Sequence, residues 1–179
     1  HRGQTLHKFE DIVRHLESCK FSTDYGLSSR TATEVRVYRQ LTVDALAPAL
    51  ALTFWLDAKN FTGLTRKWYA DKLGVPMSFY YPGLYRAKAL ELVQTSTGID
   101  DLLDPDADFD LAYLESEVMK KATEALDILS AKLGDNPFVF GQHPTTVDAQ
   151  LYAHLAPALK APLPSSGKLV QAIQERPNL

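Results

Sequence analysis

The sequence predicts an all-α fold for this chain of 179 residues. Leucine, valine and alanine recur at steps of three and four residues over several long segments, which is the period of an amphipathic helix. No segment alternates apolar and polar side chains in the manner of a half-buried strand. Apolar residues make up 45% of the chain and charged residues 23%, a composition typical of a globular protein with a buried core.

A short amphipathic helix begins the predicted fold, and a polar connector follows it. Four apolar side chains at helical spacing predict a helix that ends near Cys19; they are Phe9, Ile12, Val13 and Leu16. Residues 23–26 are polar and end in glycine, so we expect a domain junction there. Residues 1–22 would then be the remnant of one domain, and residues 23–179 would form a second, helical domain.

A long helix is expected from about Arg30 to Ala58. Pro48 lacks a backbone donor, so we expect a kink or a restart of the helix at that position. The apolar run within this helix, residues 45–56, is shorter than the roughly 20 residues that a membrane-spanning helix needs. It is therefore predicted to be a buried helix, and a break is expected after it at residues 60–63.

The middle of the chain predicts a short helix, an aromatic turn and another helix. The short helix covers about 64–73 and is stopped by Gly74 and Pro76. Aromatic residues crowd the expected turn at 79–81, and a helix over about 84–94 follows.

The last third has the clearest helical period. The acidic segment 98–110 is expected to be a solvated loop whose last carboxylates lie at the positive end of the next helix. That helix, over about 109–133, carries an apolar residue at every third or fourth position, and Gly134 is its expected C-terminal cap. Two further helices are expected around 151–159 and 169–174.

Residues 138–148 carry a capping box between the two helices with the clearest apolar faces. Thr145 can accept a hydrogen bond from the amide of Asp148, whose carboxylate can reach back to the amide of Thr145. An aromatic loop, a glycine and a proline precede the box, and an apolar helix follows it. This order resembles the C-terminal helical domain of glutathione transferases. The resemblance implies that residues 1–22 hold the last helix of a thioredoxin-like half.

Composition and residue pattern speak against nucleic-acid binding and against catalysis. The net charge of −3 offers no cationic excess for phosphate groups. The five histidines show no metal-ligand spacing, and the sequence has neither a phosphate-binding glycine loop nor a Gly-x-Ser-x-Gly motif. We therefore predict no catalytic residue, no cofactor and no metal site. Cys19, the only cysteine, is expected to be unreactive.

The alternative function is a glutathione-transferase-like enzyme that acts on small electrophiles. In the transferases, an acidic residue followed by serine commonly holds the γ-glutamyl end of glutathione, and the corresponding place here is Glu10-Asp11. An aspartate in the serine position removes a hydroxyl donor and puts a negative charge near the carboxylate of the substrate, which is unfavourable at close range. This departure favours a binding protein over an enzyme.

Two blocks in the middle of the chain resemble the metaxins, and in particular the branch of metaxin-1 and metaxin-3. They are residues 53–61 (Thr-Phe-Trp-Leu-Asp-Ala-Lys-Asn-Phe) and residues 65–70 (Thr-Arg-Lys-Trp-Tyr-Ala). Residues 24–28 and 138–141 add further matches, so the resemblance covers nearly the whole chain. Leu52 departs from the pattern, because a histidine is expected before Thr-Phe-Trp.

The resemblance implies a non-catalytic subunit of the sorting and assembly machinery of the mitochondrial outer membrane, on its cytosolic face. Such a subunit supports the import and assembly of β-barrel proteins. The implied partners are a second metaxin, in a heterodimer, and the barrel-forming core subunit; motor adaptors that transport mitochondria are a further implied link. A C-terminal membrane segment beyond Leu179 is also implied.

Two aromatic clusters are the candidate partner interface. The first consists of Arg66, Lys67, Trp68 and Tyr69, and the second of Phe79, Tyr80, Tyr81 and Tyr85. Tyrosine, tryptophan and arginine contribute most of the binding energy in protein interfaces. The alternative to an interface role for the first cluster is that Trp68 lies in the core and its cationic neighbours are solvated. For the second cluster, the alternative is that its rings only pack a helix against a loop. Phe54 and Trp55 are expected in the core.

Overall fold

The computed structural model describes residues 5–98 and 111–179 of the chain. Within these ranges the regular structure is helical, apart from an isolated bridge between Phe138 and Gly141. The predicted all-α fold is therefore confirmed for the described residues. The prediction of a solvated loop at 98–110 lies outside them, except for Gly98.

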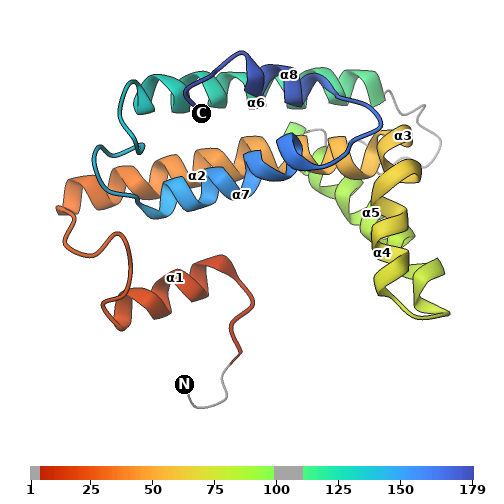
Figure 1. The fold of residues 1–179 in the computed structure, drawn as a ribbon, viewed down its shortest axis with the longest axis horizontal. Coiled ribbons are helices and arrows are strands. Elements are labelled where there is room, and N and C mark those ends of the chain that lie inside the picture. Colours follow the sequence, from red (N-terminus) through yellow and green to blue (C-terminus); the bar gives the residue numbers. More distant parts are fainter. Residues whose placement is uncertain (1–4, 99–110) are drawn as a thin grey trace.

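Eight α-helices and two π-helical segments make up the described part of the chain. They are α1 (Phe9–Ser18), α2 (Ser29–Ala51), η1 (Leu52–Leu56), α3 (Ala58–Asn60), η2 (Phe61–Thr65), α4 (Arg66–Lys72), α5 (Met77–Thr97), α6 (Leu111–Leu133), α7 (Thr146–Lys160) and α8 (Lys168–Gln174). In Figure 1, α2 and α7 lie side by side, with α6 and α8 along one side of them. α4 and the start of α5 project from one end of this body.

The core lies between α2, α6 and α7. Leu46 of α2, Leu126 and Leu129 of α6 and Val147 of α7 are fully buried in it. The apolar stripe predicted on α6 faces this core, because all of its members but one are buried; they are Leu114, Val118, Ala122, Ala125, Leu129 and Leu133. The exception is Leu111, which is 40% exposed. Gly134 ends α6 as predicted, with a φ of +54° that favours glycine.

The long helix does not restart at Pro48, so the restart, one of the two outcomes expected there, is excluded. α2 runs through Pro48 to Ala51 and continues without a gap into η1. Leu46, Pro48 and Ala49 are all buried. The proline removes one backbone hydrogen bond, and the packing of this face against α5, α6 and α7 holds the helix together across the missing bond.

The chain turns at Asp57, and not at Asn60 or Gly63 where a break was expected. Asp57 has an extended ψ of 120°, and its carboxylate caps α3 by accepting a hydrogen bond from the Asn60 amide at 2.8 Å. The arms Ser29–Leu56 and Ala58–Lys72 meet there with a bend of 61°. Among the described residues, no single helix is long and apolar enough to cross a membrane; this bent pair alone meets the length and composition test.

The aromatic residues that the sequence placed in a turn belong to a helix. α5 begins at Met77, so Phe79, Tyr80 and Tyr81 lie in its first turns and Pro82 is buried within it. Contacts with α2, η1 and α4 accompany α5 along its length. These tertiary contacts outweigh the local preference of the Pro82-Gly83 pair for a turn.

Two carboxylates cap the start of α7. Thr145 and Asp148 form the capping box, in which Asp148 Oδ2 accepts from the Thr145 amide at 2.7 Å and from the Thr145 hydroxyl at 2.8 Å. Asp148 Oδ1 also accepts from the Val139 amide at 2.8 Å. The second carboxylate is Asp24, which accepts from the amide of Thr146 at 2.8 Å and from its hydroxyl. The predicted connector is therefore bonded to the helical body.

α1 forms as predicted, but most of its apolar stripe is exposed. Val13 is buried, whereas Phe9, Ile12 and Leu16 are 39–40% exposed. An ion pair between Glu10 and the buried Arg39 of α2 joins α1 to the body. The Arg39 guanidinium also lies over the Phe9 ring, 5.0 Å from its centroid. The assignment of residues 1–22 to a separate domain stays a prediction.

Candidate functional site

The two predicted aromatic clusters meet in a hairpin formed by α4 and α5 (residues 66–85). α4 carries the first cluster and the start of α5 carries the second, and the two helices pack against each other. The hairpin extends away from the body formed by α2, α6, α7 and α8 (Figure 1). The sequence showed the two clusters but not that they share one surface.

Four rings join the hairpin to the rest of the fold, and we call them the ring stack: Trp55, Tyr69, Tyr81 and Tyr85. Tyr69 of α4 contacts Trp55 of η1, with ring centroids 4.9 Å apart, and Tyr85 of α5 at 5.6 Å. Tyr85 also contacts Trp55 at 5.7 Å and Tyr81 at 5.9 Å. Such ring pairs stabilise a fold by about 0.5–1.5 kcal/mol each beyond their area burial. Three of the eight predicted interface residues therefore hold the hairpin in place.

Large apolar side chains are exposed at the end of the hairpin, and we call them the apolar tip: Trp68, Val75, Met77, Phe79 and Tyr80. Their exposed fractions run from 47% for Trp68 and Met77 to 82% for Val75. A core position for Trp68, one of the two alternatives, is therefore excluded. Phe54 and Trp55 were expected in the core, and both are only partly buried. An exposed apolar patch is typical of an interaction site.

Val75 and Met77 were missed by sequence reasoning. They flank Pro76, where the sequence indicated only a stop signal; Val75 lies between the two helices and Met77 is the first residue of α5. The available clue was their position between two aromatic clusters, because large apolar side chains beside a turn are exposed unless another element covers them. In the structure nothing described covers Val75, which is 82% exposed.

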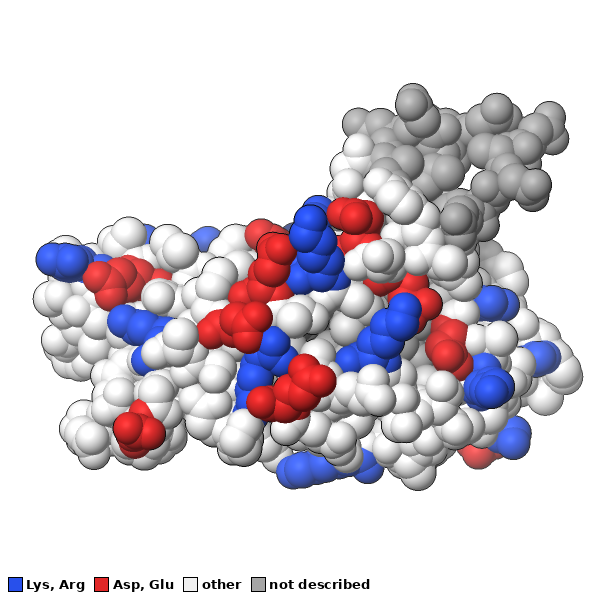
Figure 2. Space-filling view, turned by 90° about the horizontal axis from the view of Figure 1, so that it is seen from above, with Lys and Arg blue, Asp and Glu red and all other residues white. Residues whose placement is uncertain are grey.

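Basic side chains outnumber acidic ones in the segment that contains the hairpin. Residues 58–90 contain six basic side chains and one acidic side chain, a net charge of +5 in a chain whose total is −3. The basic residues are Lys59, Arg66, Lys67, Lys72, Arg86 and Lys88. Arg86 lies over the Phe61 ring at 4.8 Å, and no ion pair is found for the other five among the described residues. In Figure 2, blue and red atoms are interleaved over the middle of the face, and blue prevails at the end where α3 to α5 lie.

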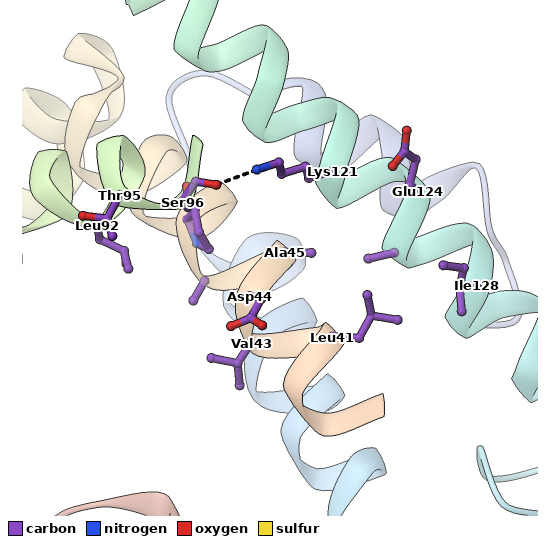
Figure 3. Close-up of a pocket in the computed structure, with 13 residues that line it drawn as sticks. Leu41, Val43, Asp44, Ala45, Leu92, Thr95, Ser96, Lys121, Glu124 and Ile128 are labelled. Carbon is purple, nitrogen blue, oxygen red and sulfur yellow. Dashed lines mark hydrogen bonds between the residues drawn. The ribbon is translucent and has the colours of Figure 1, made fainter. Parts of the chain in front are cut away.

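A groove of about 600 Å³ runs between α2, α6 and the end of α5 (Figure 3). Leu41, Leu92 and Ile128 give it an apolar lining. Lys121 is tied to the α5 end, because its Nζ donates to the Ser96 carbonyl. Asp44 and Glu124 come from different helices and lie apart in Figure 3. The groove therefore has the character of a packing surface more than of a reaction site.

A second cavity, of about 650 Å³, lies between α1, α2 and Gln150 of α7. Glu10, which sequence reasoning matched to the glutathione-holding position of transferases, is bonded here to Arg39. Arg39 Nε and Gln150 Oε1 are buried without a hydrogen-bond partner, and both residues line this cavity. A donor and an acceptor of this kind suit an ordered water.

Among residues 5–98 and 111–179, no three histidine, cysteine or carboxylate side chains are grouped closely enough to hold a metal ion. Cys19 is exposed at the end of α1, with its Sγ 3.8 Å from His15 Nε2.

The chain matches two protein families in different regions. Residues 1–86 match the family described as outer mitochondrial membrane transport complex protein. Residues 122–179 match the glutathione S-transferase C-terminal domain, which agrees with the fold inferred from the capping box. No solved structure was found to match the chain.

Curated relatives match over nearly the whole chain. Metaxin-1 of Mus musculus is 36% identical over 177 residues, which cover 99% of this chain and 54% of the relative. Metaxin-1 of Homo sapiens is 36% identical over 93% of this chain and 34% of its own length. Metaxin-3 of Danio rerio is 33% identical over 100% of this chain and 55% of its own length. The chain spans about half the length of these relatives or less, and it belongs to the metaxin family.

Proposed function

We propose that this chain is a non-catalytic helical subunit of a protein-transport complex in the mitochondrial outer membrane. The observation that carries the proposal is the match of residues 1–86 to the family described as outer mitochondrial membrane transport complex protein. That region includes all of α4, the whole apolar tip and five of the six basic residues of segment 58–90. The most exposed apolar surface of the hairpin thus lies within the matched segment.

The finer proposal is that the complex is the one that imports and assembles β-barrel proteins. In this proposal the chain faces the cytosol, pairs with a second metaxin and contacts the barrel-forming subunit, and it also serves as an attachment point for motor adaptors. The relatives named metaxin-1 and metaxin-3 support this assignment through their similarity alone.

A non-catalytic role is supported by the environment of Glu10. Its Oε1 is bonded to Arg39 of the same chain, so the amino group of a substrate would compete with this ion pair for the carboxylate. Asp11 follows it and pairs with Arg14 at 3.9 Å. Neither side chain offers the hydroxyl donor that the transferase motif uses.

We also propose that α1 belongs to a neighbouring thioredoxin-like domain, with the boundary after residue 22. The support is the exposure of Phe9, Ile12 and Leu16, each about 40% exposed on one face of the helix. An apolar stripe of this kind is buried in a complete domain. The hydrogen bonds from Thr146 to Asp24, just after that boundary, support a start of the helical domain there.

The experiment that tests the proposed function is recovery of the complex from mitochondria. The tagged protein should co-purify with a second metaxin and the barrel-forming subunit, and the double variant Arg66→Ala with Tyr80→Ala should lose this recovery. The matched control is Val37→Ala with Tyr152→Ala, which removes side chains that are 61% and 63% exposed elsewhere on the surface. Wild-type protein that fractionates away from mitochondria would refute the function; unchanged recovery of the double variant would refute the role of the hairpin.

A further inference from the structure

We propose that the apolar tip of the hairpin binds the surface of an anionic membrane, with Lys67 and Lys72 at the level of the lipid phosphates. The proposal rests on the proposed function, because it names what the hairpin contacts when the chain is at the outer membrane. The observations that carry it are the shape of the hairpin, the side chains at its end and the separation of charge along the chain.

The shape of the hairpin suits contact with a flat surface. The apolar tip comes from three consecutive segments: Trp68 from α4, Val75 from the turn, and Met77, Phe79 and Tyr80 from the first turn of α5. The turn and the start of α5 form the outer end of a projection (Figure 1), and Trp68 lies in the first half of α4. A planar surface can therefore meet the tip without first meeting the helices of the body.

The side chains at the tip match the layers of a membrane interface. Tryptophan and tyrosine concentrate where the acyl region meets the headgroups, because one end of each ring is apolar and the other is polar. Val75, Met77 and Phe79 have no polar end. Val75 lies in the turn, and Met77 and Phe79 lie at the start of α5. Side chains of this kind enter the boundary between headgroups and acyl chains.

The charges orient the chain toward an anionic surface. Residues 58–90 carry a net charge of +5, so the remainder of the chain carries −8 to give the total of −3. Each lysine or arginine near an anionic membrane is attracted to it, while acidic residues are repelled. The attraction therefore acts on residues 58–90, the segment that contains the hairpin and carries the net charge of +5.

The same features fit a protein partner less well. Lysine is depleted in protein interfaces, because its long, strongly hydrated side chain costs entropy and desolvation to bury. Lys67 and Lys72 lie within one turn of Trp68 on α4. A protein partner would need an acidic, closely fitting surface to accept a projecting apolar tip with two lysines beside Trp68, whereas a fluid bilayer adapts to the shape of the tip. Headgroup phosphates leave the ammonium groups largely hydrated.

The test is sedimentation of the whole chain with vesicles. Vesicles made of phosphatidylcholine and phosphatidylserine in equal parts should bind the chain, and vesicles of phosphatidylcholine alone should bind it far less. Neutralising two cations, as Lys67→Gln with Lys72→Gln, should weaken binding to the mixed vesicles about 25-fold, since each cation contributes about a factor of five. The control with the same loss of charge, Arg36→Gln with Lys120→Gln, should bind as the parent does.

The apolar contribution needs its own pair of variants. Val75→Ser with Phe79→Ser removes two side chains that are 82% and 75% exposed, so the fold should be unaffected and vesicle binding largely lost. The control is Val37→Ser with Tyr152→Ser, at 61% and 63% exposure. Circular dichroism of each variant verifies that the helices are intact.

Insertion of the tip can be followed through a single tryptophan. The chain has two tryptophans, and Trp55→Phe keeps an aromatic ring in the ring stack while leaving Trp68 as the only reporter. Its fluorescence should shift to the blue when mixed vesicles are added and should remain unshifted with phosphatidylcholine vesicles. An unshifted spectrum with bound mixed vesicles would show that the tip stays outside the lipid, which would overturn the proposal.

Two outcomes separate this proposal from the proposed function. If the chain binds neither kind of vesicle while Arg66→Ala with Tyr80→Ala abolishes recovery of the complex, the hairpin binds protein; the lipid proposal fails and the proposed function stands. If mixed vesicles are bound through the tip while the protein is absent from every outer-membrane complex, the lipid proposal stands and the proposed function fails. Equal binding to both kinds of vesicle would also overturn the lipid proposal.

Discussion

Asp24 accepts two hydrogen bonds from Thr146, which is 122 positions away in the sequence, one from the amide at 2.8 Å and one from the hydroxyl. Thr146 is the first residue of α7, where backbone amides lack partners and the helix dipole is positive. A carboxylate at this place stabilises the helix and also fixes the connector between α1 and α2. Asp24 thus joins the connector before α2 to the start of α7.

Replacing this carboxylate should destabilise the helical body. We expect Asp24→Ala to lower the free energy of unfolding by about 1–3 kcal/mol, because the Thr146 amide loses its partner in a partly buried place. Urea denaturation followed by circular dichroism measures the change. The control Glu124→Ala removes an exposed carboxylate from the middle of α6 and should leave stability within about 0.5 kcal/mol. Equal stabilities for the two variants would contradict the capping role of Asp24.

Gly63 is required by a close approach between η2 and the loop after α7. A Cβ atom at this position would lie 2.7 Å from Pro164 Cγ, so Gly63→Ala should force the two segments apart and cost about 1–3 kcal/mol. Gly83→Ala is the matched control, because a Cβ atom there meets nothing within 4 Å inside α5. It should be neutral or stabilise by up to about 1 kcal/mol. Thermal denaturation of both variants measures the effect. A melting temperature of Gly63→Ala equal to or above that of Gly83→Ala would contradict the close approach.

Asn60 holds the same loop through its side-chain amide. Nδ2 donates to the carbonyls of Thr53 and Ser165 at 3.1 Å each, and Oδ1 accepts from the Ser165 amide at 2.8 Å. Asn60→Ala removes the side-chain partner of the Thr53 carbonyl and of the Ser165 carbonyl and amide, and it should lower the free energy of unfolding by roughly 3 kcal/mol. Chemical denaturation gives the value, and Thr62→Ala, at an exposed neighbour, should change it little. A loss for Asn60→Ala no larger than that for Thr62→Ala would refute this anchoring role.

The ion pair between Glu10 and Arg39 should govern how firmly α1 is held. Arg39 is buried, whereas the Glu10 side chain is 69% exposed, so solvent screens the pair and its contribution is about 1 kcal/mol. Glu10→Ala should speed hydrogen exchange of the α1 amides roughly 5-fold. Asp11→Ala removes an exposed partner on the same helix and should leave that exchange unchanged. Similar exchange in both variants would show that other contacts hold α1.

Helices with a strong apolar period could be predicted from the sequence. α6, α7 and α8 lie close to where the spacing of leucine, valine and alanine predicted them, and Gly134 ends α6. Local signals failed where tertiary contacts compete with them. Pro48 was expected to interrupt α2, yet its buried face keeps the helix continuous, and the turn occurs at Asp57, whose side chain can cap the next helix.

The candidate site was predictable in its residue types but not in its arrangement. Aromatic and basic residues in 66–69 and 79–81 indicated an interface, because these types dominate binding energies. Which rings stack and which face solvent depends on how α4 packs against α5, and on the position of Trp55 between them. Tyr69 packs within the ring stack, whereas the side chain of its neighbour Trp68 is exposed.

The sequence by itself determined the all-α class, the apolar faces of the main helices and the metaxin resemblance, because each depends on residues that lie close together along the chain. The tertiary structure alone decided the links between distant residues: Asp24 with Thr146, Asn60 with Ser165, and Trp55 with Tyr69 and Tyr85. It also decided that the apolar tip is exposed, since exposure depends on which elements cover a side chain. Local spacing sets which faces of the helices are apolar, and only their packing determines which of those faces remain free to bind.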